Sequence, residues 1–132
     1  STGLDGHSDA DALLHALCDA LLGAVGAGDI GSHFPDTDSK WKGISSLILL
    51  EQVTAICRDK GFEVTNIDTI MVAQKPKLAS FLPDMKKNIS QAMAIDIGQI
   101  NIKATTTEKL GFAGKEEGIA AYAVALLSKT VN

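Results

Sequence analysis

Two histidines near the start of the chain have a spacing that suits anion and metal chemistry. Ser8 is a typical helix N-cap with Asp11 as the acid of a short capping box, which puts His7 just ahead of a helix. Free N–H groups and the positive end of the helix dipole favour an anion there. Asp11, His15 and Asp19 recur at steps of four, so they share one helix face. The pattern suits a phosphate near His7 and a metal near His15.

The same row of side chains has a plainer interpretation. An Asp/His/Asp row at helical spacing is more often a solvated helix face than a set of ligands. One imidazole does not make a zinc site, because zinc takes three or four protein ligands. This stretch alone therefore leaves both interpretations open.

A second group of acidic side chains lies in the polar connection of residues 29–43. It contains Asp29, Asp36 and Asp38 and shows no periodicity. Connections of this length are uncommon inside compact domains and usually serve a function. The three carboxylates could bind a cation or hydroxyl groups, although aspartate is also an ordinary loop residue.

Polar side chains also follow both predicted strands. Three threonines at 105–107 and then Glu108 come after one strand, and Lys75 and Lys77 follow the other. Threonine hydroxyls and loop N–H groups donate well to phosphate oxygens, and a glutamate is a hard oxygen ligand for Mg²⁺ or Mn²⁺. A strand end closed by a turn explains the threonines equally well, and lysines at a strand end are usually solubilising.

Hydrophobic periodicity predicts the elements that hold these residues. The predicted helices cover residues 9–25, 45–60, 83–94 and an alanine-rich segment at 117–129. The predicted strands cover residues 62–74 and 99–105. Apolar residues on both faces of the first strand predict that it is covered on both sides. The alternation predicts one α+β (α/β layered) domain over residues 1–132, with a mixed sheet covered by helices.

Composition excludes several classes of function. The net charge of −4 without a basic run argues against nucleic acid as the main partner. No apolar run approaches a membrane span, and no signal-peptide pattern opens the chain. Cys18 and Cys57 do not form a C-x-x-C pair, so we predict buried free thiols in a reducing compartment.

Five blocks of sequence then point to a family. The blocks are Gly-His-Ser-Asp-Ala-Asp at 6–11 with His15, Gly-Asp-Ile-Gly at 28–31, Phe-Pro-Asp-Thr-Asp at 34–38, Gln-Lys-Pro-Lys at 74–77 and Lys-Ala-Thr-Thr-Thr-Glu-Lys-Leu-Gly-Phe at 103–112. Together they closely resemble the 2-C-methyl-D-erythritol 2,4-cyclodiphosphate synthase family. Each block alone is a weak signal, but five in order over nearly the whole chain are very specific.

The resemblance implies a reaction and an assembly. The substrate would be 4-diphosphocytidyl-2-C-methyl-D-erythritol 2-phosphate of the non-mevalonate isoprenoid pathway, closed to the cyclic diphosphate with release of CMP. Members of the family are homotrimers with sheets facing the threefold axis, active sites between subunits, and an axial cavity for an isoprenoid diphosphate. The implied location is the bacterial cytoplasm, or the plastid stroma for a plant or apicomplexan source.

The resemblance also implies roles for residues at matching positions. His15 would bind Zn²⁺ and Glu108 would bind Mg²⁺ or Mn²⁺, while His7 and Thr106 would stabilise developing charge as the catalytic residues. The implied substrate-binding residues are His7, Ser8, Asp29, Ile30, Gly31, Phe34, Pro35, Asp36, Thr37, Asp38, Ala73, Gln74, Lys75, Pro76, Lys77, Leu78, Ala79, Thr105, Thr106, Thr107, Glu108, Phe112 and Lys115.

These residues divide by the part of the substrate that they would contact. Residues 29–31 would meet the ribose, and residues 34–38 would form a flap over the methylerythritol part. Residues 73–79 would form the cytosine pocket, largely through backbone groups. Residues 105–107 would hold the diphosphate.

The chain departs from the family in two places. Members carry an Asp-x-His motif on a strand pair ahead of the first block, and this motif completes the zinc site. We expect this chain to be truncated and to lack the strand pair. Such a chain would bind CDP weakly, hold little zinc and turn over negligibly. Lys115 stands where members often have arginine, and lysine loses the bidentate fork. The alternative is a non-catalytic trimeric protein that binds cytidine nucleotides without zinc.

Overall fold

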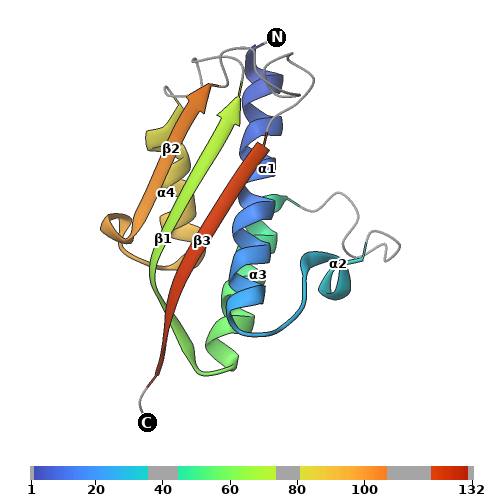
Figure 1. Ribbon diagram of the computed structural model, residues 1–132, viewed down its shortest axis with the longest axis vertical. Coiled ribbons are helices and arrows are strands. Elements are labelled where there is room, and N and C mark those ends of the chain that lie inside the picture. The colour runs from blue at the N-terminus through green and yellow to red at the C-terminus, as the bar shows by residue number, and fades with distance from the viewer. Residues whose placement is uncertain (1, 36–44, 74–80, 107–119, 131–132) are drawn as a thin grey trace.

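The protein is a three-stranded sheet with its long helices on one face (Figure 1). The computed structural model describes residues 2–35, 45–73, 81–106 and 120–130, and for residues 2–9, 73 and 106 it describes the backbone alone. Among these residues no helix is both long enough and apolar enough to cross a membrane.

The first helix, α1 (Thr2–Ala24), ends at a glycine in the left-handed region. Gly26 has φ +68°, and two hydrogen bonds close the turn, from Ala27 N to Leu22 O at 2.8 Å and from Gly26 N to Gly23 O at 3.1 Å. This is a Schellman cap, in which glycine adopts the backbone angle that other residues avoid. The predicted end of this helix is confirmed.

Two further long helices follow the sequence pattern closely. The helix α3 (Ser46–Asp59) begins after Ser45, whose hydroxyl accepts from Leu47 N at 3.2 Å. Gly61, at φ +88°, follows its end. The helix α4 (Leu82–Met93) has a proline in its first turn and buries Met85, Ile89 and Met93 on one stripe. These predictions are confirmed to within a few residues.

The strand β1 (Phe62–Ala73) is the centre of the sheet, in the order β2-β1-β3. It pairs in parallel with β2 (Ile100–Thr106), which follows α4 and the short 3₁₀ helix η2 (Ile97–Gln99). It pairs antiparallel with β3 (Ala120–Lys129). The parallel register places the carboxyl ends of β1 and β2 side by side, because Ala73 stands opposite Thr106.

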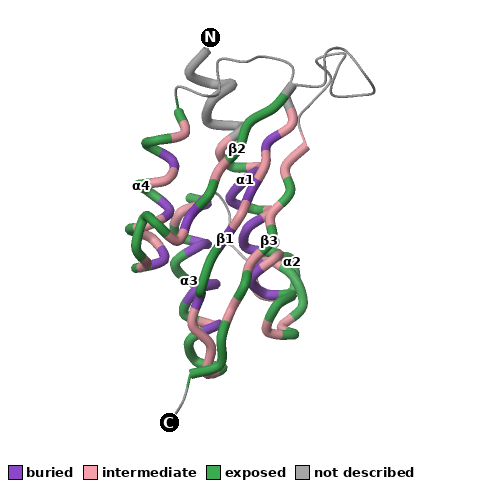
Figure 2. Tube along the Cα trace, turned by 60° about the vertical axis from the view of Figure 1, so that its left-hand side comes forward, coloured by how far each residue is buried: buried purple, intermediate pink, exposed green. Residues whose placement is uncertain are grey.

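The core lies between the sheet and the helices (Figure 2). Ile67, Thr69 and Met71 of β1 are buried under them, each at most 1% exposed. Cys18 and Cys57 are buried free thiols in the same layer, as predicted. Fully burying an aliphatic side chain contributes about 1.5–3 kcal/mol, so this layer dominates the stability of the chain.

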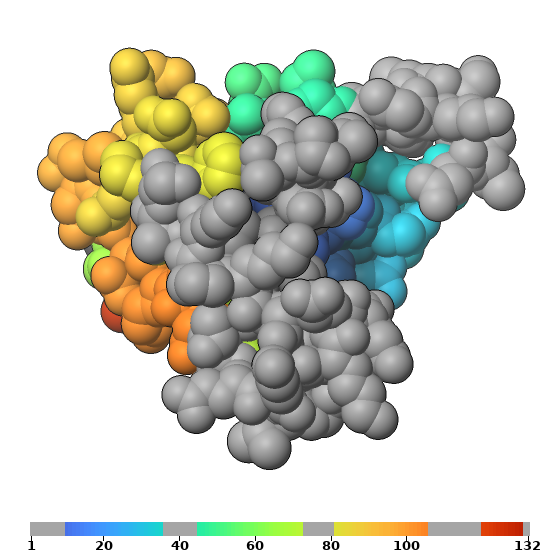
Figure 3. Space-filling view, turned by 90° about the horizontal axis from the view of Figure 1, so that it is seen from above, coloured from blue at the N-terminus to red at the C-terminus, as the bar shows by residue number. Residues whose placement is uncertain are grey.

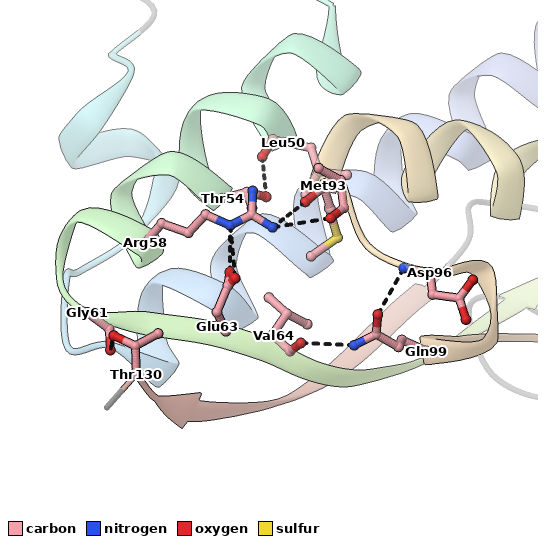
Figure 4. A network of polar contacts seen from close by, with 11 residues as sticks. Leu50, Thr54, Arg58, Gly61, Glu63, Val64, Met93, Asp96, Gln99 and Thr130 are labelled. Carbon is pink, nitrogen blue, oxygen red and sulfur yellow. Dashed lines mark hydrogen bonds and ion pairs between the residues drawn. The ribbon is translucent and has the colours of Figure 1, made fainter. Parts of the chain in front are cut away.

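The arginine Arg58 ties three elements together at the end of α3 (Figure 4). Its Nη2 donates to Met93 O at 2.7 Å and its Nε to the Glu63 carboxylate at 2.6 Å. A cation suits the carbonyl groups left free at the end of α4. Gln99 adds a second tie, since its amide donates to Val64 O at 3.1 Å.

Three predictions about local structure are wrong. The last element is the strand β3 and not a helix at 117–129, because alternate residues of 121–127 contact the helix layer and the others face away. Ser8 does not cap α1, which begins at Thr2. The connection at 29–43 contains a short helix, α2 (Ile30–His33). Among the described residues, helices lie on one face of β1, and the predicted cover on its other face stays a prediction.

Candidate functional site

The implied phosphate and cytosine segments meet at one edge of the sheet. The β1–β2 register pairs Val72 with Thr105 and Ala73 with Thr106, so both segments leave the sheet side by side. Thr105 is exposed there. Seen from this end (Figure 3), α4 and β2 lie to one side, α2 to the other, and residues of α1 between them. Parallel pairing thus joins two blocks that are distant in sequence.

The imidazole of His15 projects from the middle of α1 toward the start of α3. It is exposed, and its Nε2 lies 3.3 Å from Ser46 Oγ. Ser46 itself is only 7% exposed. An accessible imidazole with a hydrogen-bond partner on one nitrogen is typical of metal-binding histidines.

The two aspartates that flank His15 in the row have different surroundings. Asp19 Oδ1 accepts from the backbone N of Ile30 at 2.9 Å, which fixes the start of α2 against α1. Asp11 lines a hollow of about 230 Å³ between α1, α3 and α4. The three residues therefore have different roles: Asp19 makes a structural contact, His15 is a candidate metal ligand, and Asp11 lines the hollow.

The start of α2 presents the predicted ribose-binding residues. Asp29 caps this helix, since its Oδ1 accepts from Ser32 N at 3.0 Å and Ser32 Oγ donates to Asp29 O at 2.9 Å. Asp29 and Gly31 are exposed and Ile30 is half-buried. The capping bond fixes one oxygen of the exposed Asp29 carboxylate at the start of α2.

Phe34 and Pro35 follow α2, and their surroundings differ from those expected of a flap. Phe34 is 7% exposed and packs in the main hydrophobic core, while Pro35 is half-buried. The Phe34 ring therefore anchors the start of the connection to the helix layer. Its predicted contact with substrate stays a prediction.

Much of the predicted site lies outside the described residues. These positions are Asp36, Thr37, Asp38, Gln74, Lys75, Pro76, Lys77, Leu78, Ala79, Thr107, Glu108, Phe112 and Lys115. For His7, Ser8, Ala73 and Thr106 only the backbone is described, the first two within α1 and the others at the ends of β1 and β2.

The described residues include one candidate ligand of the implied zinc site, His15. Over residues 10–35, 45–72, 81–105 and 120–130, no three His, Cys, Asp or Glu side chains come together as a metal-binding group. The chain does contain one Asp-x-His triplet, Asp5-Gly6-His7, but it lies inside α1 and overlaps the first block. It is therefore not the motif that the family carries ahead of that block.

Two polar features were not predicted from the sequence. One is Ser46, which is one of two adjacent serines at the start of a helix and gave no separate signal. The other is Asp68 on β1, whose carboxylate lies 2.9 Å from Lys103 Nζ and accepts from Asn101 Nδ2 at 2.9 Å. The Lys103 ammonium, helped by Asn101, holds the pKa of Asp68 below its usual range. Strand register, which pairs Asp68 with Asn101, was the missing information.

Burial disfavours the thiolate form of both cysteines. Burial, with a smaller effect of Asp19 and Cys57, raises the pKa of Cys18 to about 12. Burial also raises the pKa of Cys57. Since the thiolate is the reactive form, neither thiol is suited to attack a substrate.

Comparisons with known proteins indicate the same family as the five sequence blocks, over nearly the whole chain. The model of the YgbB family matches residues 1–128. A protein of Syntrophobacter fumaroxidans named 2-C-methyl-D-erythritol 2,4-cyclodiphosphate synthase is 61% identical over 125 residues, covering 95% of this chain and 79% of that protein.

Solved structures share the fold. The bifunctional IspDF of Campylobacter jejuni superposes with a TM-score of 0.85 at 48% identity, over 96% of this chain and 34% of that longer one. The CDP complex of Plasmodium falciparum IspF superposes with a TM-score of 0.80 at 33% identity, over 91% of this chain and 72% of that one.

Proposed function

The chain belongs to the YgbB family of 2-C-methyl-D-erythritol 2,4-cyclodiphosphate synthases, and we propose that it closes its substrate by intramolecular phosphoryl transfer. In 4-diphosphocytidyl-2-C-methyl-D-erythritol 2-phosphate, an oxygen of the 2-phosphate attacks the β-phosphorus. The bond from that phosphorus to the CMP oxygen breaks, and CMP leaves with the electron pair. The product is the 2,4-cyclodiphosphate.

The parallel pairing of β1 and β2 is the observation that carries this proposal. It brings the block that starts at Ala73 beside the threonines that start at Thr105, as a site for a cytidine diphosphate requires. The CDP complex of the Plasmodium falciparum relative supports the same ligand class. Little covalent chemistry is demanded of side chains, because holding attacker and acceptor in line supplies much of the acceleration.

Side chains of this chain would then hold the substrate and stabilise charge. His7 and Thr106 would donate to the oxygens of the pentavalent phosphorus, which is a stabilising role and not that of a nucleophile. Asp29, held by its capping bond to Ser32 N, would accept from a ribose hydroxyl through its free oxygen. Residues 34–38 would cover the methylerythritol part, with the buried Phe34 ring as their anchor in the core.

The family uses divalent metal ions, and we propose His15 and Glu108 as ligands of two of them. The exposed imidazole of His15 fits a zinc ion as one ligand of several. A carboxylate at position 108 suits Mg²⁺ or Mn²⁺. Bound divalent cations offset the repulsion between phosphates and polarise the attacked phosphorus.

The open face of the sheet supports a threefold assembly. Tyr122, Val124 and Leu126 of β3 stand in a row on this face and are 60%, 70% and 61% exposed. Three copies packed with these faces around an axis would bury the row. Lys115 is the proposed contact of an isoprenoid diphosphate in an axial cavity of that assembly. The bacterial relatives support a cytoplasmic location.

Phosphorus NMR of the protein incubated with this substrate tests the reaction and its metals. We expect CMP and the cyclic product only with divalent cations, and recovery when they are restored after chelation. Glu108→Gln keeps the shape and removes the charge, so the rate should fall by roughly a hundredfold or more at saturating Mg²⁺. Glu51→Gln, on the exposed side of α3, is the matched control and should leave the rate unchanged. Equal product after exhaustive chelation would contradict the two-metal proposal.

A further inference from the structure

The contact between His15 and Ser46 joins two elements that are far apart in sequence. His15 Nε2 and Ser46 Oγ are 3.3 Å apart, across the packed surfaces of α1 and α3. The imidazole is otherwise exposed, whereas the serine is only 7% exposed. The rigid partner in this contact is therefore the serine.

The structure of α3 leaves the Ser46 hydroxyl free for this contact. Ser45 is the residue that caps α3, through its bond from Leu47 N. Leu49, Leu50 and Val53 then pack against the leucines of α1 in the main core, which fixes the start of α3 relative to His15. Ser46 is not needed as a cap, and its position is set by core packing.

We propose that Ser46 is a positioning residue for His15, accepting a hydrogen bond from Nε2–H so that the Nδ1 lone pair is left to bind the metal. The inference rests on the proposed role of His15 as a zinc ligand. A neutral imidazole has one N–H and one lone pair, so fixing the proton on Nε2 also decides which atom coordinates. Partners of this kind orient the ring and typically contribute ten- to a hundredfold in metal affinity.

A third histidine provides an internal reference. His33 Nε2 contacts the carbonyl oxygen of Ala27, and a carbonyl can only accept, so His33 must carry its proton on Nε2. In ¹⁵N NMR at alkaline pH, where imidazoles are neutral, metal-free wild-type protein should show the Nε2–H pattern for both His33 and His15.

Three variants distinguish the effect of the Ser46 hydroxyl on His15 from other effects of changing the start of α3. Ser46→Ala should return the His15 ring to a mixture of tautomers while His33 is unchanged. Ser46→Thr keeps the hydroxyl and should restore the wild-type pattern, since Ser46 borders the hollow of about 230 Å³ and a methyl group has room there. Ser45→Ala is the matched control, because it removes a neighbouring hydroxyl that bonds only within α3. A His15 pattern of Nδ1–H in wild type, or one unmoved in Ser46→Ala, would overturn the proposal.

Zinc affinity, measured by competition with a chromophoric chelator, tests the consequence. Ser46→Ala should bind Zn²⁺ ten- to a hundredfold more weakly, while Ser45→Ala and Ser46→Thr stay within about threefold of wild type. Equal zinc affinity in Ser46→Ala and wild type would overturn the positioning role. A wild-type protein that carries the family's Asp-x-His motif and still holds no zinc would instead contradict the proposed role of His15, and the metal-free NMR result would still decide the Ser46 contact.

Discussion

The two faces of the sheet differ more than any other two regions of the molecule. On the covered face, Ile67 and Met71 are fully buried under α1, α3 and α4. On the open face, Tyr122, Val124 and Leu126 are 60–70% exposed, beside the polar group of Asp68, Asn101 and Lys103. A row of large apolar side chains of this kind marks a surface that another protein covers. The covered face stabilises the chain, and the open face is suited to assembly.

The largest change in free energy is expected when a charge is introduced on the open face, where it should prevent assembly. Leu126→Asp would place a carboxylate without a partner in the proposed interface of every copy, at about 3–5 kcal/mol per chain. We expect a trimer to become a monomer by sedimentation or light scattering, with the helical circular dichroism retained.

A matched control uses an apolar residue on the helix side. Ile48 on α3 is 44% exposed, so Ile48→Asp adds the same charge to an exposed position away from the sheet. It should leave the assembly unchanged. Loss of assembly in both variants, or in neither, would remove the distinction between the two faces.

The next largest effect is expected on the covered face. Ile67→Ala removes a fully buried side chain and should destabilise the chain by about 2–5 kcal/mol in urea unfolding. The comparison is made in the Leu126→Asp background, so that assembly does not contribute. There Val124→Ala on the open face should change stability by about 0.5 kcal/mol or less. Similar losses for the two variants would show that the open face is also part of a core.

The smallest effect is expected from the charged pair on the open face. The folded-state pKa of Asp68 is lowered, chiefly by Lys103. The pair therefore stabilises the fold fully at pH values above the usual pKa of an aspartate, and this contribution is lost as the pH falls through the lowered pKa. NMR titration should show the Asp68 pKa returning toward its usual value in Lys103→Met. Lys129→Met, on β3, should leave it unchanged. A pKa equal in wild type and Lys103→Met would refute the pairing.

Sequence patterns predicted the elements whose periodicity is local. The apolar stripe of Met85, Ile89 and Met93 predicted α4. Ser45 and Gly61, which flank α3, predicted the two ends of that helix. The segment at 120–129 was misread because alanine and leucine favour helices on their own. There the small side chains of Ala123 and Ala125 let α1 pack on the strand, and pairing with β1 overrides propensity.

The site was less predictable than the fold. Blocks of sequence identified the residues, but not their neighbours in space. The partner of His15 is 31 residues away in sequence and depends on how α1 packs on α3. The approach of Thr105 to Val72 depends on strand register. Neither follows from local periodicity, because both result from tertiary packing.

The place of β3 in the sheet has a consequence for synthesis of the chain. Since β1 precedes α4 and β2 and β3 comes last, the ribosome releases the central strand well before its antiparallel partner. Until residues 120–129 emerge, one edge of β1 offers unpaired N–H and C=O groups beside apolar side chains. Neighbouring nascent chains on one messenger could pair through that edge, so a chaperone that holds β1 at this stage would raise the yield of folded protein.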